Sequence, residues 1–173
     1  MGPDGALLPP GELGEIVYRG PSTMSGYLDN PEATATSFAH GWFHSGDAGR
    51  FGDDGVLWFT DRYKDVIKTG GENVASIEVE KAVYAADPRV AEVAVVGLPH
   101  DHWTEAITAM VVLKPGESLD PAELTAKLKT VLDGYKVPKS VVFVDQLPKT
   151  STGKIQKNVA RSEHAAHYQD QEG

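Results

Sequence analysis

Two apolar runs in the second half of the chain limit its fold more than any other feature of the sequence. The segments "VAEVAVVG" (Val90–Gly97) and "ITAMVVL" (Ile107–Leu113) are rich in β-branched residues and are consistent with buried strands. A third run, "SVVFV", begins at Ser140 and has the same character. Buried strands must be covered by other elements, so we expect helices in the same part of the chain.

The segments before and between these runs predict two helices. Ser76 is the expected N-cap of "SIEVEKAVYAA", which carries apolar residues at helical spacing. In "DPAELTAKLKTVL", Asp120 is the expected cap, Pro121 suits the first helical position and Glu123 completes a capping box. This half of the chain is therefore predicted to be an α+β unit, with helices packed on a small mixed sheet.

The first sixty residues differ, because they are rich in Gly and Pro and show no long helical period. "GEIVYRG" (Gly14–Gly20) alternates like a strand, and "VLWFT" (Val56–Thr60) follows a turn signal and predicts a second strand. A region of this size is too small to bury much core by itself. We interpret residues 1–61 as the β-rich end of a larger N-terminal domain.

A boundary is predicted where charged residues and a Gly-Gly pair occur together. The segment Thr60–Val74, "TDRYKDVIKTGGENV", has the composition of an exposed linker, although an ordinary loop has the same composition. We place a hinge at residues 62–66 and a C-terminal domain at residues 67–173. The polar tail of that domain is expected to fray from about residue 162.

The composition excludes several classes of protein. The chain of 173 residues has no cysteine, which excludes disulfides, thiolate zinc sites and a cysteine nucleophile. No apolar run approaches the ~20 residues that span a bilayer, and the N-terminus lacks the features of a signal peptide. We therefore expect a cytoplasmic protein without a transmembrane segment. The net charge of -9 argues against a nucleic-acid partner, because binding to nucleic acid depends on many Lys and Arg contacts.

One segment departs from this acidic composition. Between residues 136 and 161 there are six basic residues and one acid, which together give a charge of +5. Two interpretations remain open, a solvated basic face or a site for a small polyanion such as a nucleotide. We call these basic residues the basic strip: Lys136, Lys139, Lys149, Lys154, Lys157 and Arg161.

The motif "PKTSTGK" within the strip is similar to a phosphate-binding loop, because it ends in Gly-Lys and is rich in hydroxyl side chains. A Walker loop needs Gly, four residues, and then Gly-Lys-Ser/Thr. Here Pro148 stands at the first Gly position and Ile155 follows Lys154, so the motif is not a Walker loop. It predicts a turn hinged at a glycine that presents one ammonium, which is either surface decoration or a group that reaches an oxyanion.

Two further motifs, together with Arg62, supply candidate binding residues. "FHSGD" places Asp47 on a Gly turn, where a carboxylate could accept hydrogen bonds from two ribose hydroxyls, although turn Asp is also common for backbone reasons. Arg62 could do similar work or pair with a nearby acid. "PHDHW" has two histidines, too few ligands for a metal, so no metal site is predicted. Trp103 in that motif is either a partly buried aromatic residue or a platform for a flat ligand.

The order of these motifs resembles a known family. "GWFHSGD", "GVLWFTDRYKDVIKTGGENVASIEVE", "VAEVAVVGLPH" and "YKVPKSVVFVDQLPKTSTGK" are similar to the C-terminal third of the acyl-adenylate-forming superfamily. Its members include acyl-CoA synthetases, nonribosomal peptide adenylation domains and luciferases. The resemblance runs from about Pro3 to Arg161. The forms "GGEN", "GWFHSGD" and "YKVPKS" are most similar to bacterial fatty-acyl-CoA or aryl-CoA synthetases.

The resemblance implies a small C-terminal lid domain and a role for each matched position. Asp47, preceded by Ser45 in place of the usual Thr, and Arg62 would bind the ribose of ATP. Lys64 would be the hinge between the domains. Lys154 would be the lysine essential for adenylation. The residues implied near CoA are Gly70 and Gly71, which line the pantetheine tunnel, together with Trp103 and the segment from Lys136 to Lys139.

The implied activity is that of an ATP-dependent acid–CoA ligase. A carboxylate and ATP form an acyl-adenylate and pyrophosphate, and CoA then forms the thioester and releases AMP. The family rotates its small domain between the steps, so that Lys154 serves one face and Gly71 the other. ATP and CoA would be bound, and Mg²⁺ would be held by ligands mostly outside this chain.

The chain also departs from the family. The phosphate loop, the acyl pocket and the "YGxTE"-like motif do not occur in it. We therefore interpret it as a fragment, a truncated gene product or half of a split enzyme, whose partner is the missing N-terminal domain and which is inactive alone. Two alternatives remain: an adenylation domain that loads a carrier protein, and a non-catalytic module that binds a nucleotide or CoA.

Overall fold

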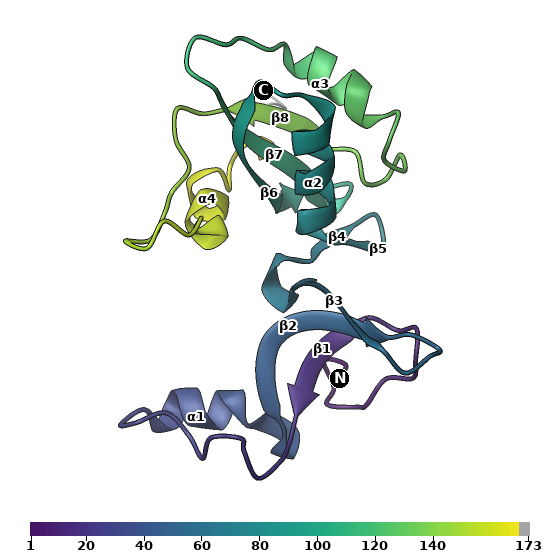
Figure 1. Ribbon diagram of the computed structural model, residues 1–173, viewed down its shortest axis with the longest axis vertical. Helices are drawn as coiled ribbons and strands as arrows, with labels where there is room; N and C mark the ends of the chain where they lie inside the picture. The colour runs from purple at the N-terminus through teal and green to yellow at the C-terminus, as the bar shows by residue number, and fades with distance from the viewer. Residues whose placement is uncertain (170–173) are drawn as a thin grey trace. The chain divides into compact units, whose positions relative to one another are not determined.

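Two β-sheets organise the described residues, one on each side of a division between Lys64 and Asp65 (Figure 1). The computed structural model describes residues 1–169. We call the part from Met1 to Lys64 unit 1 and the part from Asp65 onward unit 2. The hinge proposed at residues 62–66 includes this division, and movement there stays a prediction.

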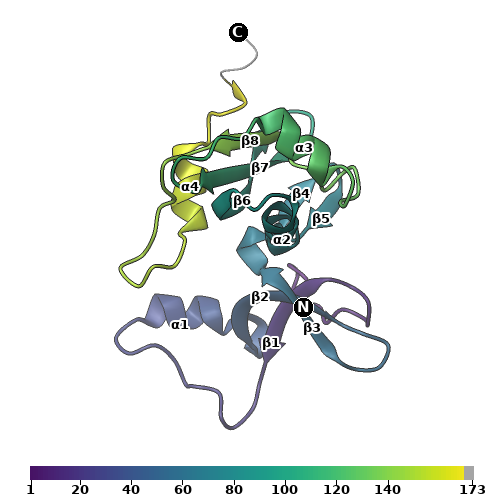
Figure 2. The ribbon, with the colours of Figure 1, turned by 45° about the horizontal axis from the view of Figure 1, so that its top comes forward.

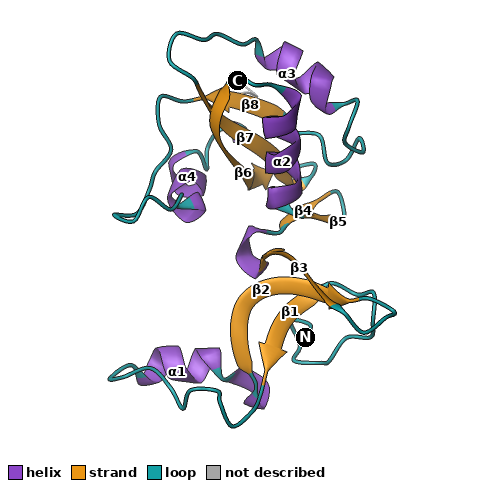
Figure 3. Ribbon diagram, in the orientation of Figure 1, coloured by secondary structure: helices purple, strands orange, loops and turns teal. Residues whose placement is uncertain are grey.

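Unit 1 contains a three-stranded antiparallel sheet whose strands lie in chain order (Figure 3). The two predicted strands are present, and the "FHSGD" motif, predicted as a turn, lies inside a third strand. A short helix precedes that strand and begins at a side-chain cap, because Asn30 Oδ1 accepts a hydrogen bond from Ala33 N at 3.0 Å. The elements are β1 (Gly14–Tyr18), α1 (Pro31–Ser37), a 3₁₀ turn (Ala39–Gly41), β2 (Phe43–Phe51) and β3 (Leu57–Arg62).

The sheet of unit 1 exposes apolar side chains on both faces. Leu57, Trp58 and Phe59 are consecutive in β3, and they are 43%, 58% and 56% exposed. Successive side chains of a strand point to opposite faces of the sheet. Neither face of β3 is therefore fully covered at these three residues by the other described residues.

The sheet of unit 2 is mixed and is centred on one long strand, β7. That strand pairs antiparallel with β6 over most of its length, parallel with β8, and with β4 through the single pair Thr69 and Thr104. The prediction of an α+β unit with a small mixed sheet is confirmed. The elements are β4 (Ile67–Thr69), β5 (Glu72–Val74), α2 (Ser76–Ala86), β6 (Val90–His100), β7 (Thr104–Leu113), α3 (Pro121–Leu128), β8 (Ser140–Phe143) and α4 (Lys157–Glu163), after a 3₁₀ turn at Tyr63–Asp65.

Both faces of this second sheet are covered, which explains why its strands are nearly continuous apolar runs. Val93 and Val95 of β6 point to the face on which α2 and α3 pack. Ala94 and Val96 point to the opposite face, where they pack with Ala160 of α4. Figure 2 shows α2 and α4 on opposite sides of β6.

The predicted helix starts are only partly correct. The N-cap of α2 is Ala75 and makes no side-chain hydrogen bond, whereas Ser76 is buried and its Oγ accepts a hydrogen bond from Lys157 Nζ at 2.6 Å. Asp120 does cap α3, since its Oδ1 accepts from Ala122 N at 2.7 Å. Glu123 does not complete the capping box, because its carboxylate pairs with Arg89 and with Lys127, one turn later in α3.

Two further expectations differ from the structure. The segment predicted as an exposed linker, Thr60–Val74, consists largely of strand residues, and it buries Ile67 and Val74 in the core of unit 2. The tail predicted to fray from about residue 162 forms turns up to residue 169. In it, the hydroxyls of Tyr168 and Thr108 share a hydrogen bond of 2.9 Å. The rest of that prediction, residues 170–173, lies outside the described residues. Within residues 1–169 no helix is long and apolar enough to cross a membrane.

Candidate functional site

The candidate ribose-binding residues of unit 1 lie side by side on two strands. Asp47 of β2 is opposite Arg62 of β3 in the antiparallel register, and Arg62 Nη1 donates a hydrogen bond to Asp47 Oδ1 at 2.5 Å. Both side chains are partly exposed. Gly46 has a φ of +73°, and a Cβ there would lie 3.2 Å from Arg62 Nη2, so a glycine suits both the backbone and the space.

A second acid, which the sequence did not single out, fixes the backbone around Asp47. Glu15 of β1 accepts hydrogen bonds from Gly46 N at 2.8 Å and, if the ring nitrogen carries a proton, from His44 Nδ1 at 2.7 Å. Ser45 Oγ donates to Ile16 O at 2.6 Å and accepts from Asp47 N at 3.0 Å. No local pattern singles out Glu15, because its partners are about thirty residues away.

The Gly70–Gly71 turn of unit 2 joins β4 to β5 and is exposed. Its two residues have φ values of +57° and +86°, which favour glycine. Gly70 N donates a hydrogen bond to Trp103 O at 3.0 Å, and the Trp103 ring lies 3.2 Å from where a Cβ on Gly70 would be. Lys139 Nζ lies 4.4 Å from the centroid of the same ring, within cation–π range. The structure thus brings Gly70, Trp103 and Lys139, all implied near CoA, into contact with one another through the Trp103 ring.

Lys136 does not join this group through its ammonium. Its Nζ forms ion pairs with Glu78 at 2.8 Å and with Asp133 at 3.1 Å. The hydrogen bond to Glu78, followed by that to Asp133, raises the pKa of Lys136 above its usual value. Lys136 is thus held by partners within unit 2, and a direct contact between this residue and CoA stays a prediction.

Lys154 stands at the end of a tight turn. Lys149 and Ile155 form an isolated antiparallel bridge, Thr150 N donates to Lys154 O at 2.8 Å, and Lys154 N donates to Thr150 Oγ1 at 3.1 Å. Gly153 has a φ of +82°, which allows the chain to reverse. The sequence prediction of a turn hinged at a glycine is confirmed, and Lys154 itself is exposed.

The basic strip is mostly neutralised by acids of the same unit. Within residues 1–169, the ammonium of Lys154 has no carboxylate in ion-pairing range. The ammonium of Lys139 contacts the ring of Trp103 and not an acid in the same part of the chain. The other four residues of the strip are paired: Lys136 with Glu78 and Asp133, Lys149 with Glu92, Lys157 with Glu80, and Arg161 with Asp65. The strip is therefore better described as a set of surface ion pairs than as one continuous anion site.

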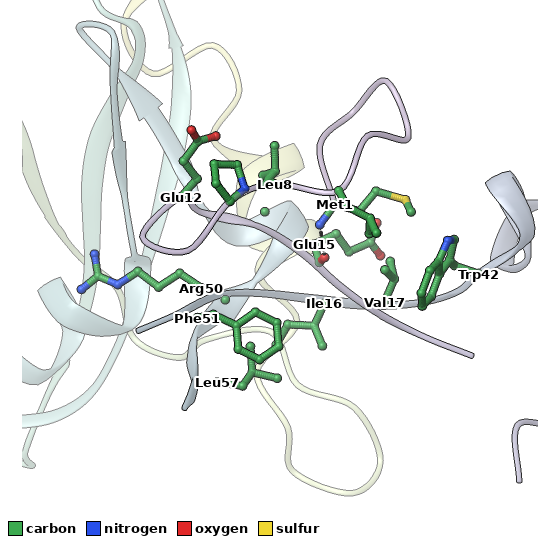
Figure 4. Close-up of a pocket in the computed structure, with 14 residues that line it drawn as sticks. Met1, Leu8, Glu12, Glu15, Ile16, Val17, Trp42, Arg50, Phe51 and Leu57 are labelled. Carbon is green, nitrogen blue, oxygen red and sulfur yellow. Dashed lines mark hydrogen bonds between the residues drawn. The ribbon is translucent and has the colours of Figure 1, made fainter. Parts of the chain in front are cut away.

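An apolar hollow lies elsewhere, in unit 1 (Figure 4). It has a volume of about 320 Å³, and Ile16, Trp42 and Leu57 are among the residues that line it. Asp47 and Arg62 do not line it. Most side chains around this hollow in Figure 4 are apolar, although Glu15 is among them. The hollow therefore does not account for Asp47 and Arg62.

The fold and these residues define a class of protein. Residues 78–154 match the family described as the AMP-binding enzyme C-terminal domain. Most of unit 2 therefore belongs to this family, and the resemblance to the C-terminal part of the acyl-adenylate-forming enzymes is confirmed.

Individual relatives agree with this class. A feruloyl-CoA synthase from an Amycolatopsis species is 50% identical over 160 residues, which are 92% of this chain and 32% of that enzyme. The crystal structure of ATP-bound MatB from Rhodopseudomonas palustris is 40% identical, with a TM-score of 0.81 over 93% of this chain and 32% of MatB. An amide bond synthetase, McbA from Marinactinospora thermotolerans, is also 40% identical, with a TM-score of 0.77 over 94% of this chain and 33% of McbA. The chain thus spans about a third of the length of these relatives.

Proposed function

We propose that this chain is the C-terminal part of an ATP-dependent acid–CoA ligase and is inactive without the N-terminal part. The observation that carries the proposal is Lys154, which lies on an exposed turn without an acid partner among residues 1–169. The chain that contains it is similar to enzymes named as CoA synthases and ligases. The missing two thirds of the relatives' length would contribute the remaining part of the site, including the acid pocket and the ligands of Mg²⁺. Within residues 1–169 no three His, Asp or Glu side chains gather to hold a metal, so no step is assigned to a metal on this chain.

In the first half-reaction the carboxylate of the acid attacks the α-phosphorus of ATP, and pyrophosphate leaves. Asp47 would accept hydrogen bonds from the ribose hydroxyls, and Arg62, which already donates to Asp47, would orient that carboxylate. Lys154 would place its ammonium between the approaching anions and stabilise the negative charge of the transition state. Because its Nζ has no acid partner in the described chain, no ion pair needs to be broken first.

In the second half-reaction the CoA thiolate attacks the acyl-adenylate carbonyl, and AMP leaves with the bonding electrons. The Gly70–Gly71 turn would let the pantetheine arm pass close to the backbone, since no Cβ projects there. Trp103, held against Gly70, would pack on the flat or apolar part of the ligand. Lys64 would act as the hinge that exchanges the two faces of the small domain, and the enzyme would be cytoplasmic.

A fusion tests this proposal. This chain replaces the equivalent C-terminal third of the Amycolatopsis feruloyl-CoA synthase, and ferulate, ATP and CoA are supplied. The fusion should release AMP, whereas the chain alone should release none. Lys154→Ala should slow adenylate formation by about 10²–10³-fold and spare thioester formation from supplied feruloyl-adenylate.

Lys149→Ala is the matched control, because Lys149 lies in the same turn but is paired with Glu92. It should leave both half-reactions within a factor of a few of the parent fusion. Robust turnover by the isolated chain would contradict the assignment as a fragment. Equal loss of both half-reactions in Lys154→Ala would contradict the assignment of two separate faces.

A different acceptor is the second candidate, because one similar structure is that of an amide bond synthetase. In that case an amine, and not CoA, would attack the adenylate. Supplying feruloyl-adenylate to the fusion with either CoA or a simple amine separates the two possibilities, since only the true acceptor should accelerate AMP release.

A further inference from the structure

The strand before the Gly70–Gly71 turn, β4, pairs with β5 along its length but is only sparsely paired with β7. β4 has three residues, and its register with β7 consists of the single pair Thr69 and Thr104. A short strand with a single pair to β7 opens easily unless other contacts hold it. The question is therefore what fixes the start of the turn in place.

A carboxylate supplies one of the missing attachments. Glu105, the second residue of β7, accepts a hydrogen bond at its Oε2 from Lys68 N of β4 at 2.7 Å. Lys68 is two residues before Gly70. A backbone N–H bonded to an ionised acceptor makes a stronger bond than one bonded to a neutral carbonyl. The side chain of Glu105 thus replaces a ladder hydrogen bond next to the turn.

An interior glycine of β6 has a spatial explanation in the same contact. Gly97 does not have a positive φ, so its conformation does not require glycine. A Cβ there would lie 2.8 Å from Glu105 Cδ, 2.9 Å from Glu105 Oε2 and 2.9 Å from Ile67 Cγ2. Glycine in the interior of a strand weakens it and often marks a close approach. Here the missing side chain leaves room for the Glu105 carboxylate, which accepts the hydrogen bond from Lys68 N of β4.

The residue before Glu105 points to the same conclusion. Thr104 has a φ of +67°, which is unusual for a β-branched residue and costs free energy. This conformation follows directly after Trp103, whose carbonyl accepts the hydrogen bond from Gly70 N. Residues 103–105 therefore hold residues 68–70 through two hydrogen bonds and one strand pair.

We propose that Glu105 is a positioning residue for the Gly70–Gly71 turn, and that Gly97 is present to admit its carboxylate. The part of this inference that concerns the reaction rests on the proposed function, in which the turn lines the path of the pantetheine arm. Glu105 touches no substrate in this proposal. It acts by keeping the turn and the Trp103 carbonyl in one arrangement during thioester formation.

The first test uses the 173-residue chain alone and does not depend on activity. Amide hydrogen exchange is measured by NMR for the parent chain, Glu105→Ala and Glu105→Gln. In Glu105→Ala the amides of Lys68 and Gly70 should exchange about tenfold faster or more. Glu105→Gln keeps an acceptor oxygen and should fall between the two. Glu117→Ala, at an exposed loop position, is the control and should leave both amides unchanged.

Exchange in the centre of β6 and β7 separates a local from a global effect. The amides of Val95 and Ala109 should change much less than those of Lys68 and Gly70 in Glu105→Ala. Unchanged exchange at Lys68 and Gly70, or equal acceleration at all four amides, would overturn the proposal.

A double-mutant cycle tests the role of Gly97. Gly97→Ala should strongly destabilise the parent chain but cost less in the Glu105→Ala background, where the carboxylate is gone. Some loss should persist in both backgrounds because Ile67 is also close. If the two effects simply add, the link between Gly97 and Glu105 is wrong.

The last test uses the fusion with feruloyl-CoA synthase. Glu105→Ala should slow thioester formation from supplied feruloyl-adenylate by about tenfold and adenylate formation by less than a factor of about two. Equal loss in both half-reactions would overturn the specific role in the second. A parent fusion without either activity would count against the proposed function, while the exchange and stability tests would still decide the structural role of Glu105.

Discussion

The two sheets of this chain both contain apolar strand residues but differ strongly in how deeply these residues are buried. In unit 2 the interior of β6 and β7 is packed on both faces, by α2 and α3 on one side and α4 on the other. In unit 1 the apolar residues of β3 remain about half exposed on both faces. An apolar strand therefore indicates where cover is needed, and unit 1 lacks that cover among the described residues.

The largest expected contrast comes from matched truncations in the two sheets. Ile107→Ala, at a fully buried position of β7, should lower the free energy of unfolding of unit 2 by about 2–5 kcal/mol. Phe59→Ala, at an exposed position of β3, should change stability by less than about 0.5 kcal/mol. Urea unfolding followed by residue-specific amide exchange measures both. Similar losses would show that unit 1 buries Phe59 in solution.

A smaller contrast concerns a buried acid of unit 2. Asp87 is 1% exposed and accepts hydrogen bonds from Arg89 and Lys127. These bonds, first from Arg89 and then from Lys127, hold the pKa of Asp87 well below its usual range. Asp87→Asn should lower the free energy of unfolding of unit 2 by about 2 kcal/mol at pH 7. This loss is smaller than that from breaking an isolated buried ion pair, because Glu123 still pairs with Arg89 and Lys127.

The same acid predicts a dependence on pH. Because the folded-state pKa of Asp87 is below the unfolded-state value of about 4, its stabilisation is present above that value and is lost as the pH falls below it. Unit 2 of the parent chain should therefore lose stability below about pH 4, and Asp87→Asn should lose less over that range. Thermal unfolding measured from pH 7 down to pH 3 checks this, and parallel curves for the two proteins would refute it.

The smallest contrast lies in backbone strain. Unit 1 places Asp29 and His40 at positive φ, and these residue types tolerate that region. Unit 2 places the β-branched Thr104 there. Thr104→Gly should raise the stability of unit 2 by about 0.5 kcal/mol, the relief of strain less the entropy cost of glycine. Thr104→Val keeps the strain and should show no gain, and equal melting temperatures for both variants would contradict this explanation.

The outcome of the sequence predictions depends on how far apart the interacting residues are. The strands of unit 2 and the cap of α3 at Asp120 were predictable, because periodicity and capping are local. The role of Ser76 was not predictable, because its partner Lys157 is 81 residues away in the sequence. β4 and β5 were hidden by their charged composition, since strands at the edge of a sheet can be polar and still bury alternate residues.

The candidate site shows the same limit. Local motifs indicated Asp47 and Lys154, and the family resemblance added Gly70 and Gly71. Each of these residues is a positive-φ glycine or follows one. The residues that hold these motifs in place, such as Glu15 and Glu105, carry no local signal. Their partners lie 31 and 37 residues away, so only the pairing of the strands reveals them.

The pairing within the basic strip has a consequence for how anions reach this chain. Since four of the six cations are matched by acids nearby, they contribute little to the long-range field, which is governed by the net charge of -9. A nucleotide would approach such a surface against a weak repulsion and not under electrostatic steering. Added salt screens that repulsion, with a Debye length of about 8 Å at physiological ionic strength. Nucleotide association with this chain would therefore become faster as the ionic strength rises, which is opposite to the behaviour of a typical basic binding site.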